Sequence, residues 1–117
     1  EPGFVIWENA DYAAILSNEP YMDGHTLVVP KHNYHNDVFE LSDEVYFGLM
    51  AAVKEVGKLL KGVFKPDRLL VWVRGYEVAH VHVHLIPSHM DVDLVSAQAH
   101  KAEEGELKEV WEKIRRG

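Results

Sequence analysis

The stretch AHVHVHLIPS, residues 79–88, alternates histidine with aliphatic residues. Successive side chains of a β-strand point to opposite faces of a sheet, so this pattern predicts a strand with three imidazoles in a row on one face. The aliphatic side chains then lie on the other face. The three histidines are His80, His82 and His84.

Working outward, the neighbouring residues predict four more strands. RLLVWV, residues 68–73, is separated from the histidines by a short turn, so the two strands are expected to pair as an antiparallel hairpin. Three short β-like segments come earlier, at residues 4–8, 12–17 and 25–30, with turn residues between them. They predict a meander, and the histidine strand then lies well inside the sheet.

Two segments carry helical patterns. Ser42 is a candidate N-cap before two acidic residues and a long apolar periodicity, with Gly62 and Pro66 expected to close that helix. Residues 101–116 repeat the helical spacing near the end of the sequence. The prediction is an α+β fold: an antiparallel sheet of about five strands with one main helix packed on it and a C-terminal helix. The main helix is expected to have one apolar face, made by Val45, Leu49, Val53, Val56 and Leu60.

Composition and charge limit the classes of function that this sequence can have. The 117 residues are expected to form one domain, 1–117, with 47% hydrophobic and 26% charged residues. No apolar run is long enough for a membrane span and no secretory signal pattern is found, so we expect a cytoplasmic protein without a membrane partner. The net charge of −7 argues against a nucleic-acid polymer as partner, although a small anionic ligand remains compatible. The absence of cysteine excludes thiolate metal sites.

Three interpretations of the histidine row are open. A solvated sheet face explains a lone histidine well, but three at alternating positions are unusual because imidazole has no strong strand preference. A metal site is the second interpretation. Positions i and i+4 of a strand lie roughly 13 Å apart, so two of the three histidines would need His25 or His89 as a further ligand.

Nucleophilic catalysis is the third interpretation. A neutral imidazole nitrogen can attack an electrophile and later depart, and imidazole is largely neutral near pH 7. Phosphorus is the natural target, because the flanking histidines can donate hydrogen bonds to phosphoryl oxygens.

The sequence resembles the histidine-triad (HIT) superfamily of nucleotide hydrolases and transferases. The similarity lies in HVHVHLIP (80–87), in YAAILSNEPYMDGHTLVVPK (12–31) and in FELSDE (39–44). The resemblance implies a HIT-like α+β half-barrel, a homodimer whose sheets join, and a small nucleotide whose α-phosphate faces the middle histidine. It also implies cleavage of a nucleoside 5′-phosphoryl bond through a nucleotidyl-histidine, releasing a nucleoside monophosphate.

Residue roles follow from the same resemblance. His82 would be the nucleophile, His80 and His84 would orient it and bind phosphoryl oxygens, and His25 would be the fourth histidine of the pocket. The intact third histidine resembles the hydrolases rather than the nucleotidyltransferases. No resident cofactor or metal ligand is implied, and Mg²⁺ can accompany a polyphosphate substrate.

Two segments depart from the family pattern. Tyr76 stands where many members have a glutamine near the leaving group, with Glu77 beside it, and Ser17 stands where many have a ribose-binding aspartate, with Asn18 next to it. Two alternatives to a hydrolase therefore stay open: a nucleotide-binding or regulatory module with negligible turnover, and a histidine-based metal-binding protein.

Overall fold

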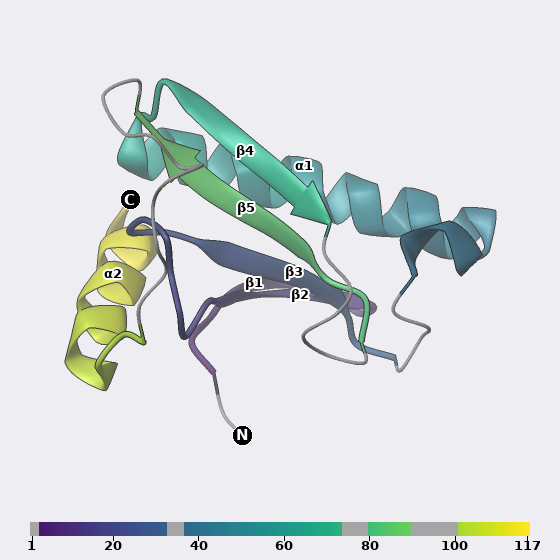
Figure 1. Ribbon diagram of the computed structural model, residues 1–117, viewed down its shortest axis with the longest axis horizontal. Helices are drawn as coiled ribbons and strands as arrows, with labels where there is room; N and C mark the ends of the chain where they lie inside the picture. The colour runs from purple at the N-terminus through teal and green to yellow at the C-terminus, as the bar shows by residue number, and fades with distance from the viewer. Residues whose placement is uncertain (1–2, 33–36, 74–79, 90–100) are drawn as a thin grey trace.

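The computed structural model describes residues 3–32, 37–73, 80–89 and 101–117. In this part of the chain five antiparallel strands form one open sheet in the order β1-β2-β3-β5-β4, and two helices accompany it (Figure 1). The α+β prediction is confirmed. The elements are β1 (Val5–Glu8), β2 (Tyr12–Leu16), β3 (Thr26–Pro30), the 3₁₀ turn η1 (Val38–Glu40), α1 (Asp43–Phe64), β4 (Arg68–Val73), β5 (Val83–Ser88) and α2 (Glu104–Arg116).

Strand β5 lies between β3 and β4 and pairs antiparallel with both. His84 is directly opposite Leu27 of β3 on one side and Trp72 of β4 on the other. The predicted pairing of residues 68–73 with the histidine strand is therefore confirmed. A histidine on β5 is held by strands on both sides, which fixes its direction.

The start of β5 differs from the prediction. We expected a strand over residues 79–88, but β5 begins at Val83, so His80 and His82 precede it. The pairing of β3 with β5 ends at Val28 opposite Val83. If this register continued for two more residues of β3, Pro30 would have to donate a main-chain hydrogen bond. Proline has no N–H group, so it cannot. The ladder stops for this reason.

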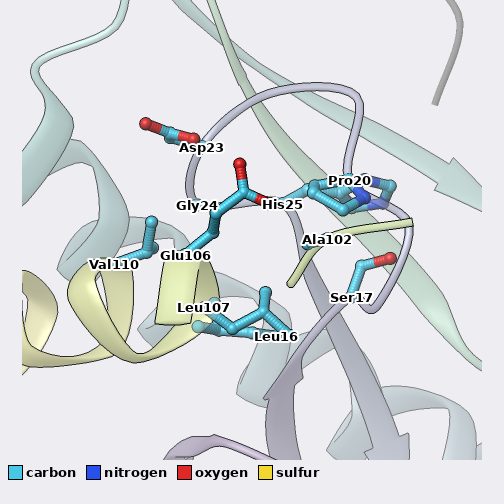
Figure 2. A pocket seen from close by; sticks show the side chains of 10 residues that line it. All are labelled: Leu16, Ser17, Pro20, Asp23, Gly24, His25, Ala102, Glu106, Leu107 and Val110. Atoms are coloured by element: carbon cyan, nitrogen blue, oxygen red, sulfur yellow. The ribbon is translucent and has the colours of Figure 1, made fainter. Parts of the chain in front are cut away.

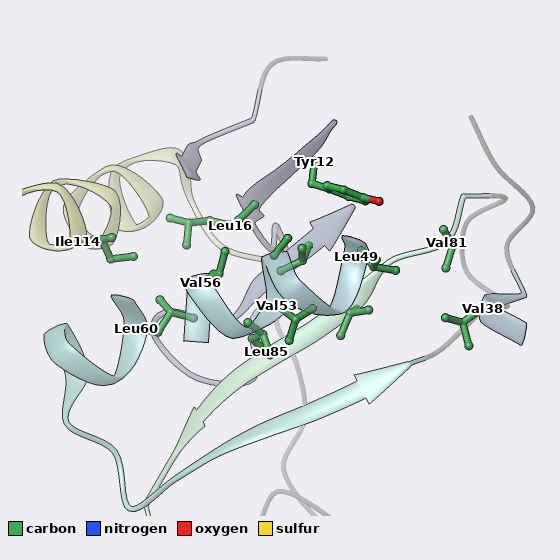
Figure 3. Packing of buried hydrophobic residues seen from close by; sticks show 14 of the residues in the cluster. Tyr12, Leu16, Val38, Leu49, Val53, Val56, Leu60, Val81, Leu85 and Ile114 are labelled. Carbon is green, nitrogen blue, oxygen red and sulfur yellow. The ribbon is translucent and has the colours of Figure 1, made fainter. Parts of the chain in front are cut away.

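The hydrophobic core lies between α1 and one face of the sheet. Val81, Val83 and Leu85 are fully buried in it, as the alternation predicts, together with Leu49 and Leu60 of α1 (Figure 3). Each such side chain contributes about 1.5–3 kcal/mol by leaving water. His82 and His84, at the alternate positions, therefore point away from α1.

Helix α1 begins as predicted and ends between Gly62 and Pro66, the two residues expected to close it. Ser42 is its N-cap, and its hydroxyl accepts the Val45 N–H at 3.3 Å. Gly62 was expected to close the helix but lies inside its last turn; the helix continues to Phe64 and ends at Lys65, which adopts φ 48°. The helix can pass through Gly62 because a single glycine costs only about 1 kcal/mol inside a helix.

Helix α2 packs beside β1. The Trp111 indole N–H donates to the Val5 carbonyl at 2.9 Å, and Leu107 and Ile114 are buried in the core. The β1–β2 pairing also shifts register between Val5 and Trp7, which is a bulge. This edge of the sheet is thus interrupted and covered. Among the residues that the structure describes, neither helix is long and apolar enough to cross a membrane.

Candidate active site

The middle histidine of the triad has a defined tautomer. Its Nδ1 lies 2.9 Å from the His80 carbonyl oxygen. A carbonyl can only accept, so Nδ1 of His82 carries the proton, and the neutral ring keeps a lone pair on Nε2. This contact is possible because His80 and His82 lie outside the β-ladder. Inside the ladder, the His80 carbonyl would accept a hydrogen bond from a neighbouring strand instead.

His25 and His84 form a buried pair across 59 residues of sequence. His25 Nε2 lies 2.8 Å from His84 Nδ1, and the main-chain N–H of Tyr21 donates to His25 Nδ1 at 3.1 Å. Only 2% of His25 and 8% of His84 are exposed, so water does not compete strongly for these contacts. The structure brings the predicted fourth histidine into direct contact with the triad.

The His82 and His84 rings are neighbours. Their centroids are 4.9 Å apart with an interplanar angle of 61°, and the His25 and His84 centroids are 5.1 Å apart. His82 is 4% exposed. Three imidazoles thus lie in sequence, His25 to His84 to His82, in a site largely shielded from water. A shielded site strengthens any hydrogen bond to a charged phosphoryl group.

His80 has a different position from its two partners. Its Nε2 donates to the Pro30 carbonyl at 2.9 Å, and its own carbonyl holds His82. One of its ring nitrogens is therefore engaged with the end of β3. The prediction that all three histidines lie on one strand is wrong, because the strand begins only at Val83.

Ser17 and Asn18 follow the end of β2, close to His25. Ser17 is 6% exposed; its N–H donates to the His25 carbonyl at 2.9 Å, and its hydroxyl accepts the Glu19 N–H at 3.1 Å. Asn18 is exposed, and its carbonyl accepts the Ala102 N–H at 2.8 Å. Both predicted residues therefore hold the turn beside the histidines.

A small cavity lies between this turn and α2 (Figure 2). Ser17, Pro20 and His25 line it from the turn, and Glu106 and Leu107 from the helix. Its volume of about 60 Å³ is far below the several hundred Å³ of a typical ligand pocket. It is too small for a nucleoside.

An apolar strip adjoins the histidines on the sheet face opposite α1. Leu27 of β3 is directly opposite His84 of β5, and Ile15 of β2 is opposite Leu27. Val29 follows Leu27 by two residues on β3, so its side chain lies on the same face. All three are only partly buried. Partly exposed aliphatic side chains beside a polar cluster can contact the flat face of a base.

The other candidate residues are Tyr76, Glu77 and His89. Tyr76 and Glu77 lie outside the described residues. His89 follows the far end of β5, 3.8 Å from Asp67. Within residues 3–32, 37–73, 80–89 and 101–117, no group of three or more His, Asp or Glu side chains is placed to hold a metal ion.

Sequence reasoning missed three groups beside the histidines. The Tyr21 amide and the Pro30 carbonyl both bind triad-region imidazoles, yet a main-chain group carries no residue-type signal. Trp72, opposite His84, could have been found by counting back through the predicted hairpin.

Known proteins resemble this chain in sequence. The HIT domain matches residues 1–91. An uncharacterized HIT-like protein of Saccharolobus solfataricus is 32% identical over 91 residues, covering 74% of this chain and 65% of the relative. One of Methanocaldococcus jannaschii is 36% identical over 90 residues, covering 74% and 69%. The match thus spans less than two thirds of the Saccharolobus relative.

Solved structures share the fold over nearly the whole chain. A Hit-like protein involved in cell-cycle regulation from Bartonella henselae superposes with a TM-score of 0.87 at 27% identity, covering 99% of this chain and 87% of that one. A hypothetical histidine triad nucleotide-binding protein from Sulfolobus tokodaii gives 0.85 at 28% identity, covering 99% and 83%. Together with the sequence matches, these similarities show that the chain belongs to the HIT domain family.

Proposed function

We propose that the protein is a nucleotide hydrolase in which His82 attacks a nucleoside 5′-phosphoryl group. The substrate class is a dinucleoside polyphosphate, a nucleoside phosphoramidate or an adenylylated compound. One observation carries the proposal: the His80 carbonyl holds the proton of His82 on Nδ1, which leaves Nε2 as a neutral nucleophile without any need for a separate base. Family membership and the nucleotide-binding name of the Sulfolobus protein support the substrate class.

The reaction has two steps. In the first, His82 Nε2 forms a bond to phosphorus, the bond to the leaving group breaks, and the departing group takes a proton from solvent. In the second, water attacks phosphorus, the P–N bond breaks, its electron pair returns to Nε2, and a proton is released. The neutral His84 ring donates a hydrogen bond to a non-bridging oxygen in both steps, which stabilises the developing charge.

The apolar strip suits the nucleoside. Ile15, Leu27 and Val29 offer aliphatic contacts beside His84, so a base can pack there while its 5′-phosphate reaches the histidines. Ser17 and Asn18 lie at the end of β2 as candidate contacts to the sugar, and Tyr76 and Glu77 remain candidates near the leaving group. The nucleophile and the hydrogen-bond donors of this mechanism are protein groups, so it requires no resident metal; Mg²⁺ would enter bound to a polyphosphate substrate.

We also propose a homodimer joined through β4. The two edges of the described sheet differ: β1 is bulged and covered by α2, whereas β4 has one described partner strand. Val71 and Val73 are 48% and 47% exposed although their register partners in β5 are fully buried. A long apolar edge strand invites pairing, and a second copy offers a matching one.

Turnover of a substrate panel tests the function. Purified protein is mixed with adenosine 5′-phosphoramidate and with diadenosine polyphosphates, and AMP release is followed by chromatography. The proposal predicts catalytic release of AMP from at least one of them. Calorimetric AMP binding with no release from any substrate would instead establish a binding module, and stoichiometric zinc in untagged protein would favour a metal-binding role.

A further inference from the structure

The turn between β2 and β3 reaches the triad through a main-chain group. Tyr21 N–H donates to His25 Nδ1 at 3.1 Å. An N–H group can only donate, so Nδ1 of His25 holds a lone pair and the ring proton is on Nε2. That proton is donated to His84 Nδ1 at 2.8 Å. His84 Nδ1 must then be an acceptor, which leaves the proton of the neutral His84 ring on Nε2.

The tautomers of both rings therefore follow from one amide. Without the Tyr21 N–H, His25 could carry its proton on either nitrogen, and the His25–His84 contact would form equally well in the opposite direction. The opposite direction places a lone pair on His84 Nε2. A lone pair there repels phosphoryl oxygens, whereas an N–H group attracts them.

The turn that carries this amide is tightly held. His25 N–H donates to the Met22 carbonyl at 3.1 Å, and the Thr26 hydroxyl donates to the Gly24 carbonyl at 2.8 Å. Gly24 has φ 89°, and a Cβ atom there would approach the Phe64 ring to 2.6 Å. Figure 2 shows Gly24 and His25 together on this turn. The amide is thus placed by a turn that packs against the end of α1.

We propose that Tyr21 is a positioning residue whose main-chain amide sets the tautomers of His25 and His84, so that His84 presents Nε2–H to the bound phosphoryl group. The catalytic consequence rests on the proposed function, but the tautomers do not. Tyr21 needs no contact with substrate to act in this way, and its effect passes through two imidazoles.

The direct test is ¹⁵N NMR of the histidine rings in the wild-type protein near neutral pH. Protonated and unprotonated ring nitrogens differ widely in ¹⁵N shift, so each tautomer can be assigned. The proposal predicts protonated Nε2 and unprotonated Nδ1 for both His25 and His84. A protonated Nδ1 on either ring would overturn it, whether or not the protein hydrolyses any nucleotide.

A matched pair of variants isolates the amide. Tyr21→Pro removes both the phenol ring and the N–H, whereas Tyr21→Ala removes the ring and keeps the N–H. Loss of the ring contacts with His25 and Trp72 is common to both. Tyr21→Ala should keep the wild-type tautomers, and Tyr21→Pro should show mixed protonation of the two nitrogens of His25. Unchanged tautomers in a folded Tyr21→Pro protein would contradict the proposal.

Turnover then links the tautomer to function. We expect kcat of Tyr21→Pro to fall about 2- to 10-fold below that of Tyr21→Ala, less than the 10²–10³ expected for complete loss of a charge-stabilising donor, because a mixed population keeps part of the correct tautomer. If Tyr21→Pro does not fold, the wild-type NMR result decides the proposal alone. If the tautomers are as predicted but no substrate is hydrolysed, the positioning role stands and the proposed hydrolase function fails.

Discussion

At the scale of single residues, His82 and His84 differ in what their hydrogen bonds leave available. His82 donates a hydrogen bond from Nδ1–H to the His80 carbonyl and holds its lone pair on Nε2, whereas His84 accepts a hydrogen bond from His25 at Nδ1 and holds its proton on Nε2. In the proposed mechanism, two identical side chains with ring centroids 4.9 Å apart therefore act as nucleophile and as donor because their neighbours differ. The difference predicts different costs of replacement.

His82→Ala should lose several orders of magnitude in kcat while retaining AMP binding, because the covalent route disappears and the nucleoside contacts remain. Steady-state kinetics measure the loss in kcat, and calorimetry measures the retained AMP binding. His32→Ala is the matched control, since His32 is exposed on a loop 3.8 Å from Asp11. A His82→Ala variant that hydrolyses substrate near the wild-type rate would show that another group attacks.

His84→Ala should reduce kcat by about 10²–10³, because one donor to the phosphoryl oxygens is lost. It should also destabilise the fold by about 1–3 kcal/mol, since the buried Nε2–H of His25 loses its acceptor. Turnover and urea unfolding report the two effects separately. A change in stability with unaltered kcat would mean that His84 only supports the core.

At the scale of elements, features encoded by adjacent residues can be predicted from the sequence. Features that depend on contacts between distant segments cannot. Strand β4 and the start of α1 are as predicted, because alternation and an N-cap are encoded by adjacent residues. The start of β5 is not, because Pro30 on another strand ends the ladder. The resemblance places His25 in the pocket, but its contact with His84 spans 59 residues and the direction of that contact depends on a main-chain amide, so the residue pattern alone does not reveal either.

The cap of α1 gives a prediction at this scale. Ser42→Ala should lower the free energy of unfolding by about 1 kcal/mol, because the Val45 N–H loses its hydroxyl acceptor. Ser42→Asp is the control, since a carboxylate can accept the same bond. Chemical denaturation checks both. Equal stability of Ser42→Ala and wild type would mean that solvent replaces the cap without cost.

At the scale of the whole molecule, the two sheet edges predict the assembly. Val73→Asp should convert a dimer to a monomer, because it places a charge on the apolar side of the β4 edge. Val5→Asp is a matched control: Val5 is 39% exposed on the opposite edge, where α2 packs. Sedimentation of the variants at tens of micromolar checks this. A monomeric wild-type protein, or dissociation by Val5→Asp alone, would place the interface elsewhere.

The central claim is that His82 becomes covalently nucleotidylated, and trapping that intermediate tests it most directly. Protein is mixed briefly with adenosine 5′-phosphoramidate, quenched without acid to preserve the P–N bond, and measured by intact mass and peptide mapping. The structure predicts an adduct with the mass of an adenylyl group on His82, because this ring keeps its lone pair on Nε2. An adduct on His25, His80 or His84, or rapid turnover with no adduct under conditions that trap it, would contradict the account.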